Sequence, residues 1–163
     1  MINKIIVLLE KTLLHIKCTI ILMLYKIRYG SRFKYGKKVI FREGFKVRIE
    51  NNGILLLGDD IFFNANCSIN CLEKIVIGSS NRFGENVHLY DHNHRVNQND
   101  WKEYTKSPIT IGKHNWICTN TVVLKGVKIG DNTVIQANSL VSKNIPTNSL
   151  YINGQIIAKR QKS

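Results

Sequence analysis

Cysteine is scarce in this chain, and its spacing argues against two classes of protein. The four copies are Cys18, Cys67, Cys71 and Cys118. They form no Cys-x-x-Cys pair and no dense cluster, so neither a metal site nor a disulfide framework is indicated. We therefore expect reduced thiols that are buried as small apolar side chains.

The chain also lacks an apolar run long enough to cross a bilayer. In residues 1–30 the longest stretch without a charged residue runs from Cys18 to Tyr25. A membrane span needs roughly 18 apolar residues. No small-residue cleavage site follows the stretch. The sequence therefore predicts neither a transmembrane helix nor an ordinary signal peptide.

Acidic residues are few. The chain has 11 aspartates and glutamates against 24 lysines and arginines, which gives a formal net charge of +13. Such a charge suits an anionic ligand, a membrane surface or nucleic acid. No nucleic-acid-binding motif accompanies it, and aromatic residues are not interleaved with the basic ones as a stacking platform requires. We therefore expect no nucleic-acid partner.

What the chain does have is a strict period of six residues. The aliphatic positions are Ile111, Ile117, Val123, Ile129, Ile135 and Val141. Four residues after an aliphatic position stands a compact side chain, as at Thr121, Val127, Thr133 and Ser139. A helix repeats about every 3.6 residues and a flat strand every second residue, so neither explains this pattern. A coiled parallel sheet does, and the period predicts an all-β solenoid, a parallel β-helix.

The period extends upstream and is then interrupted. Leu57, Phe63 and Ile69 share one register, and after a two-residue slip Ile77, Phe83 and Leu89 share the next. A glycine directly follows a repeat aliphatic at Gly58, Gly78, Gly112 and Gly130. Between Tyr90 and Thr110 the period disappears, over a length that is uncommon for a structureless loop and more often functional. We expect the chemistry in this excursion loop, residues 90–110.

The N-terminal residues follow the period of a helix instead. One apolar stripe contains Ile2, Ile5, Ile6, Leu9, Leu13, Ile16, Ile20, Met23, Leu24 and Ile27. A separate face holds Lys4, Lys11, His15 and Lys26. The sequence leaves two alternatives: a helix that caps the open end of the coil, or a helix that lies on an anionic membrane. The predicted organisation is an amphipathic helix over 1–30, the β-helix over 31–153 and a basic tail over 154–163.

Residues 88–95 concentrate the side chains that can do acid–base chemistry. Three histidines, His88, His92 and His94, lie within seven residues. A positioned imidazole can take a proton from an alcohol or an amine during acyl transfer. Zinc binding is the weaker alternative, because no two histidines have the His-x-x-x-x-His separation of the β-helical carbonic anhydrases. A third alternative is that the imidazoles only hydrogen-bond the loop.

Several motifs together resemble one family. They are Asp91-His92-Asn93-His94, Ser107-Pro108-Ile109-Thr110-Ile111-Gly112, Asn115-Trp116-Ile117 and Val141-Ser142-Lys143-Asn144-Ile145-Pro146. With the hexads, they resemble the left-handed β-helix (hexapeptide-repeat) acetyltransferases. Within these they look most like the branch of maltose/galactoside, xenobiotic and surface-polysaccharide O-acetyltransferases. The resemblance covers roughly residues 57–146.

The resemblance implies roles for particular residues. His94 is implied as the general base. Contacts with the acceptor are implied for Asn86, Asp91 and His92. Contacts with acetyl-CoA are implied for Trp116, Thr119, Ala137, Ser142, Lys143, Lys159 and Arg160. Two departures from the family pattern are Cys118, in place of a glycine, and Asn153-Gly154-Gln155-Ile156, in place of a Gly-x-Pro-Ala segment.

The implied function is an acetyl-CoA-dependent O-acetyltransferase that acts on a saccharide hydroxyl, such as that of a cell-surface polysaccharide, a capsule or a lipopolysaccharide precursor. The alternatives are a small acceptor (a sugar, an antibiotic or an amino sugar), a β-helical zinc hydratase and a non-catalytic β-helix. The resemblance also implies a homotrimer with sites between subunits and no metal. We expect a cytoplasmic enzyme, with membrane contact through residues 1–38 as the alternative role of the helix.

Overall fold

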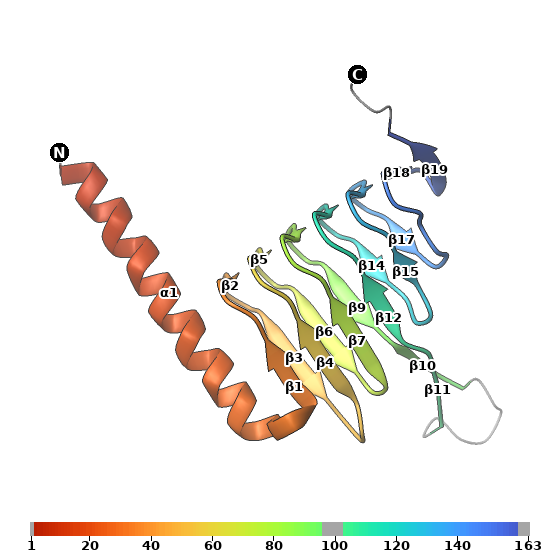
Figure 1. Ribbon diagram of the computed structural model, residues 1–163, viewed down its shortest axis with the longest axis horizontal. Helices are drawn as coiled ribbons and strands as arrows, with labels where there is room; N and C mark the ends of the chain where they lie inside the picture. The colour runs from red at the N-terminus through yellow and green to blue at the C-terminus, as the bar shows by residue number, and fades with distance from the viewer. Residues whose placement is uncertain (1, 96–102, 160–163) are drawn as a thin grey trace.

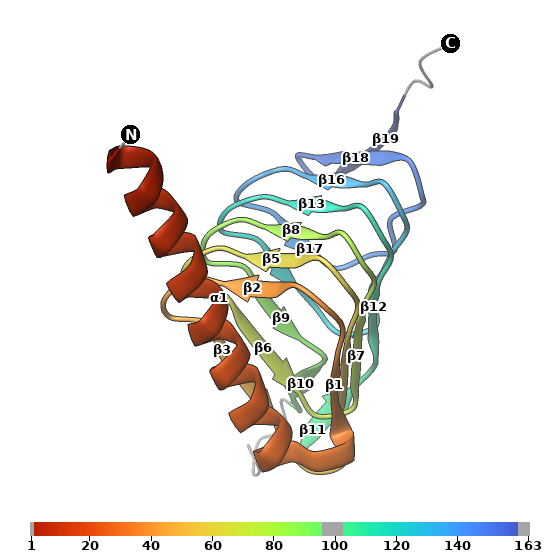
Figure 2. The ribbon, with the colours of Figure 1, turned by 60° about the vertical axis from the view of Figure 1, so that its left-hand side comes forward.

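Three parallel sheets form the body of the protein. The computed structural model describes residues 2–95 and 103–159. Its strands wind around a common axis as a three-sided coil, and one helix crosses the N-terminal end of the stack (Figures 1 and 2). The predicted all-β solenoid with an N-terminal helix is therefore confirmed.

Each sheet collects one strand from successive turns of the coil. The first sheet contains β1 (Phe33–Tyr35), β4 (Ile54–Leu57), β7 (Lys74–Ile77), β12 (Ile109–Ile111) and β15 (Lys128–Ile129). The second contains β2 (Val39–Phe41), β5 (Ile61–Phe63), β8 (Arg82–Phe83), β13 (Trp116–Ile117), β16 (Val134–Ile135), β18 (Ser149–Ile152) and β19 (Gln155–Ala158). The third contains β3 (Lys46–Ile49), β6 (Ser68–Cys71), β9 (His88–Tyr90), β14 (Val122–Val123) and β17 (Leu140–Val141). Within these sheets, β18 and β19 pair antiparallel.

The six-residue period corresponds to one side of the coil. Ile117 pairs with Phe83 in the preceding turn and with Ile135 in the following one. All three side chains are buried. The other two sheets build equivalent columns, so every sixth residue points into a continuous apolar interior. Stacking of Phe63 on Phe83, with ring centroids 4.4 Å apart, extends this interior toward the N-terminal turns.

The two-residue slip between Ile69 and Ile77 has a local explanation. Ile77 still pairs with Leu57, so the sheet keeps its register across the slip. The extra residues are accommodated in the bend at Leu72 and Glu73, which separates β6 from β7. The backbone N–H groups of this bend face the excursion loop.

The repeated glycines stack on one another at a corner of the coil. A Cβ on Gly78 would lie 2.6 Å from the carbonyl oxygen of Gly112, and one on Gly58 would lie 2.9 Å from the carbonyl carbon of Gly78. Both obstacles are backbone atoms, which cannot move aside as a side chain can. Close approach of successive turns is therefore the reason for glycine at these positions.

Helix α1 (Ile2–Tyr29), which leads into the 3₁₀ turn η1 (Gly30–Arg32), covers the first turn of the coil. Its buried side chains are Cys18, Leu22 and Tyr29. Polar atoms of the helix also contact the backbone of all three N-terminal edge strands. On β1, Lys26 Nζ donates to the Phe33 carbonyl (2.9 Å). On β2, Cys18 Sγ donates to the Phe41 carbonyl and accepts the Phe41 N–H, both at 3.3 Å. On β3, Tyr29 Oη donates to the Val47 carbonyl (3.1 Å), and Tyr25 Oη accepts the Val47 N–H (3.3 Å). The helix thus caps the coil.

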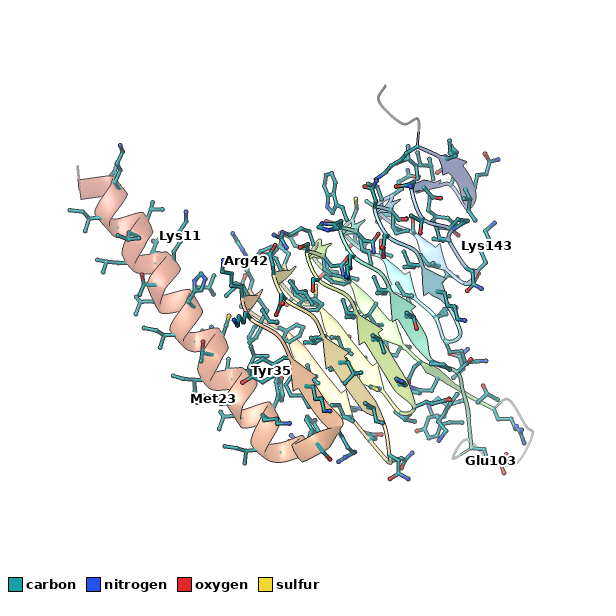
Figure 3. All side chains as sticks on the ribbon, in the orientation of Figure 1. Lys11, Met23, Tyr35, Arg42, Glu103 and Lys143 are labelled. Carbon is teal, nitrogen blue, oxygen red and sulfur yellow. The ribbon has the colours of Figure 1, made fainter. Side chains whose placement is uncertain are left out.

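The apolar stripe identified in the sequence is not the face of α1 that packs on the coil. Its members from Ile5 to Ile27 are exposed. Figure 3 labels one of them, Met23, on the side of the helix that faces away from the sheets. Among the described residues, no helix has the length and apolar character of a membrane span.

Candidate active site

An antiparallel hairpin leaves the coil within the predicted excursion. Its arms are β10 (His92–His94) and β11 (Tyr104–Lys106), seen at the lower right of Figure 1. The Ser107 N–H donates to the Asp91 carbonyl (2.9 Å), and the Gly126 N–H donates to the Ser107 carbonyl (3.1 Å). These bonds fix the base of the hairpin to the next turn of the coil. Residues 96–102 between the arms lie outside the described residues.

Asp91 anchors the start of the hairpin. Its side chain is fully buried. One oxygen accepts the Leu72 N–H and the other the Glu73 N–H, each at 2.8 Å. The first oxygen also lies 3.0 Å from Nδ1 of His92. The structure therefore gives Asp91 a positioning role, and the acceptor contact that the family resemblance implies stays a prediction.

His92 and His94 lie on the same side of β10, because side chains two residues apart in a strand share a face. The ring of Tyr104, on the opposite arm, lies 5.4 Å from the ring of His92 and 4.6 Å from that of His94. His92 is half-buried, whereas His94 is exposed. Sequence reasoning missed Tyr104, although the alternation Tyr104-Thr105-Lys106 is typical of a strand.

A groove runs along the outer face of the third sheet toward this hairpin. Its volume is about 590 Å³. It is lined by Tyr25, Arg28, Tyr29, Gly44, Lys46, Val47, Arg48, Asn66, Ser68, Asn70, His88 and Tyr90. The ring of Tyr90 lies 6.2 Å from that of His92, so the groove ends beside the two histidines. Three cations, several hydrogen-bonding side chains and tyrosine rings make it suitable for a polar anionic ligand.

His88 belongs to the wall of this groove. Its Nδ1 lies 2.8 Å from Oγ of Ser68, and Asn70 Nδ2 donates to the same oxygen at 3.2 Å. The arrangement follows from the register, because Ser68 and His88 are paired residues of β6 and β9. His88 thus has a hydrogen-bonding role in the groove, apart from the hairpin.

Asn86 lies at the opposite end of β9 from the hairpin. It adopts a left-handed backbone conformation (φ 55°) in the corner before the third sheet, and Asn120 and Asn138 do the same in the next two turns. Asn86 Nδ2 donates to Asn120 Oδ1 (2.9 Å), and Asn120 Nδ2 donates to Asn138 Oδ1 (3.0 Å). Asparagine tolerates this conformation better than most residues. Asn86 therefore has a structural role in the corner in addition to the acceptor contact that the resemblance implies.

Three of the residues implied in acetyl-CoA binding lie along or beside the edge between the second and third sheets, where Asn86 also lies. Trp116 lies on the outer face of the second sheet and is 57% exposed. Thr119 and Ala137, both half-buried, lie in successive corners between the second and third sheets. Burial raises the pKa of the half-buried Cys118 thiol, which is in the same corner as Thr119. An exposed indole beside these corner residues could hold the thioester arm of acetyl-CoA.

The other described residues implied in acetyl-CoA binding do not lie on this edge of the coil. Ser142 and Lys143 follow β17, on the edge from which the hairpin departs. Lys159 lies at a third edge, where its Nζ donates to the Asn132 carbonyl at 2.6 Å. Arg160 lies outside the described residues. One chain therefore places His94 on one edge of the coil and the column of Thr119 and Ala137 on another.

The described residues offer no alternative metal centre. In the ranges 2–95 and 103–159 no group of three or more histidine, cysteine, aspartate or glutamate side chains could hold a metal ion. All four cysteines are free, and Cys18, Cys67 and Cys71 are buried. Burial raises the pKa of Cys67 to about 11, and burial with the nearby Asp91 carboxylate raises that of Cys71 to about 12. These thiols are therefore protonated at neutral pH.

Comparison with known proteins points in one direction. The family "Bacterial transferase hexapeptide (six repeats)" matches residues 108–143. The putative lipopolysaccharide biosynthesis O-acetyl transferase WbbJ of Escherichia coli K12 is 26% identical over 87% of this chain and 79% of its own length. Galactoside O-acetyltransferase of the same organism is 32% identical over 74% of this chain, which spans about half (49%) of that enzyme.

A solved structure of another protein has a similar coil. The hexapeptide-repeat acetyltransferase VCA0836 of Vibrio cholerae, crystallised with acetyl-CoA, superimposes with a TM-score of 0.69 at 25% identity. The match covers 78% of this chain and 72% of that one. Repeat, coil and relatives agree: the chain carries the bacterial transferase hexapeptide repeat and is similar in sequence and fold to hexapeptide-repeat acetyltransferases.

Proposed function

We propose that the protein transfers the acetyl group of acetyl-CoA to a saccharide hydroxyl, with His94 as the general base. The observation that carries this proposal is the hairpin, which holds two imidazoles outside the coil on one face of β10. Asp91 and the backbone bonds of Ser107 fix its base, so the imidazoles are held in place before a substrate arrives.

In this mechanism His94 takes the proton of the acceptor hydroxyl while the hydroxyl oxygen attacks the acetyl carbonyl carbon. The new C–O bond forms as the C–S bond of the thioester breaks, and the leaving sulfur takes the proton from His94, so that coenzyme A departs as the thiol. No acyl-enzyme is formed. The N–H groups of Trp116 and Cys118 donate to the carbonyls of Thr133 and Ile135 in the next turn. The N–H of Thr119 is therefore the proposed donor to the acetyl carbonyl oxygen. A general base contributes about 10²–10⁴ in rate. Orientation of the two substrates accounts for the remainder.

The site is proposed to form between subunits of a homotrimer. His94 and the column of Thr119 and Ala137 lie on different edges of the same coil. A second copy that presents its own edge to the hairpin would bring a base and an acetyl-CoA surface together. This separation within one chain supports an assembly in which each site uses two subunits.

The proposed acceptor is an acidic saccharide of a cell-surface polysaccharide or its precursor. The groove that ends beside His92 offers Arg28, Lys46 and Arg48 to carboxylate or phosphate groups. Asn70 and the tyrosine rings suit hydroxyls and sugar faces. Such precursors are built at the cytoplasmic face of the membrane, which is where we propose that the protein works. Asn86, Asp91 and His92 remain the proposed acceptor contacts from the family resemblance.

The test is acetyl-CoA consumption with a panel of acidic, neutral and amino sugars. We expect turnover with an acidic saccharide and a loss of at least about 100-fold in kcat for His94→Ala, because only the proton-transfer step is removed. His92→Ala is the matched control and is expected to lose much less. If His92→Ala were the more damaging change, His92 would be the base. If no acceptor promoted acetyl-CoA consumption, the proposed function would be wrong.

A further inference from the structure

Helix α1 has two apolar faces on opposite sides. A helix advances about 100° per residue. The inner face, formed by Cys18, Leu22 and Tyr29, packs on the first turn of the coil. The opposite side, here called the outer face, consists of Ile5, Ile6, Leu9, Leu13, Ile16, Ile20, Met23, Leu24 and Ile27. A helix that served only as a cap would need the first face and not the second.

The outer face is large and uncovered. Its side chains are between 47% and 79% exposed. At about 1.5 Å per residue, the stretch from Ile5 to Ile27 is roughly 33 Å long. Continuous exposed apolar surface of this extent marks a site of interaction. Figures 1 and 2 show the helix at the end of the stack, so nothing in the described part of the chain reaches across its outer side.

Positive charge is concentrated around the same helix. Residues 1–42 contain ten lysines and arginines and one acidic residue, Glu10. Lys17 and Arg28 border the outer face along the helix, and Lys34, Lys37 and Lys38 are exposed on the first turn of the coil. Long basic side chains at the border of an apolar face can reach anionic headgroups while the apolar residues enter the acyl region.

The charge distinguishes two potential occupants of the outer face. A second copy would bring two sets of these cations together, with one acidic residue each to balance them. An anionic bilayer surface under the outer face would attract the cations that border it, Lys17 and Arg28. The charge therefore favours lipid over self-association.

We propose that α1 lies in the interface of an anionic membrane, with its outer face among the lipids and its inner face holding the coil. The helix lies parallel to the membrane surface and does not cross it. The turns of the coil then extend away from the membrane, and the groove and hairpin remain open to the aqueous side. This inference rests on α1 alone and does not depend on the identity of the acceptor.

The test is flotation of the full-length protein with vesicles of phosphatidylcholine alone or with phosphatidylglycerol added. We expect binding to the anionic vesicles that weakens as salt is raised, because the attraction is screened. The triple variant Ile16→Glu/Ile20→Glu/Ile27→Glu should bind at least about tenfold more weakly. The carboxylates would repel the anionic headgroups and would replace apolar side chains that enter the acyl region. Ile16→Leu/Ile20→Leu/Ile27→Leu is the matched control and should bind as the unchanged protein does.

Circular dichroism and the urea midpoint check that the glutamate variant keeps its fold, which we expect because the outer face makes no contact with the coil. Acetyl-CoA consumption with a soluble acceptor should also be unchanged. The proposal is overturned if the full-length protein does not bind anionic vesicles, or if the glutamate variant binds them equally well. It is also overturned if ultracentrifugation shows self-association that the glutamate variant abolishes, without vesicle binding; the outer face would then be an interface between copies.

Discussion

Replacing Asp91 tests how the hairpin is attached to the coil. In Asp91→Ala, the N–H groups of Leu72 and Glu73 lose their acceptors. A buried N–H without a partner costs about 1–3 kcal/mol. Leu72 is buried and Glu73 is exposed, so the second loss is the smaller one. We therefore expect a total destabilisation of about 2–4 kcal/mol, a large fraction of the roughly 5–15 kcal/mol that stabilises a typical domain.

Urea unfolding measures this change. With a slope of about 2 kcal/mol per molar urea, the midpoint should fall by about 1–2 M at equal protein concentration. Asp91→Asn keeps one acceptor oxygen but turns an NH₂ group toward the other N–H, so we expect an intermediate midpoint. Glu73→Ala is the control, because it leaves both backbone N–H groups and the carboxylate in place.

The reasoning would be refuted if Asp91→Ala unfolded at the same urea concentration as the unchanged protein, because the carboxylate would then not anchor the bend. Activity gives a second measurement. If Asp91 affects catalysis only by holding the hairpin and its two histidines, Asp91→Ala should reduce kcat no further in a His92→Ala/His94→Ala background. An additional loss there would favour a direct contact of Asp91 with the acceptor.

Two further predictions follow from the coil and from the composition of the site. The purified protein should carry no stoichiometric zinc and keep its activity in chelator, because no histidine pair has the zinc spacing; one zinc per chain by metal analysis would favour a hydratase. Gly78→Ala should lower the urea midpoint, because the added Cβ meets the Gly112 carbonyl oxygen at 2.6 Å. Lys74→Ala, at an exposed position of the preceding strand β7, is the control and should change the midpoint much less; equal midpoints for the two variants would mean that the turns can separate without cost.

The coil could be predicted from the sequence because its period is a local property. Ile111, Ile117 and Val123 are each the inward-pointing residue on one side of a turn of the coil. Their equal spacing in the sequence is enough to predict this, without knowledge of distant contacts. The helix was also predicted, but not which face would pack. The stripe from Ile5 to Ile27 is the more continuous one, yet the face with Cys18 and Leu22 supplies side chains that fit the first turn.

The site could be predicted only in part. The excursion and its histidines were visible as a break in the period and a cluster of titratable residues. The role of Asp91 was not, because its partners are backbone N–H groups about 18 residues earlier, brought close by one turn of the coil. The groove was hidden for the same reason, since its cations, from Arg28 to Arg48, meet the polar residues of β6 and β9 only through strand pairing.

The contacts of α1 with the edge strands end the coil on its N-terminal side. A parallel coil has no natural end, because each turn presents the same row of N–H and carbonyl groups that the next turn would need. At the N-terminal end a thiol, two phenols and an amine from α1 occupy groups on β1, β2 and β3. Another coil cannot be added there without displacing the helix. A repeat that could in principle grow into a fibre is thereby closed at this end by four side chains.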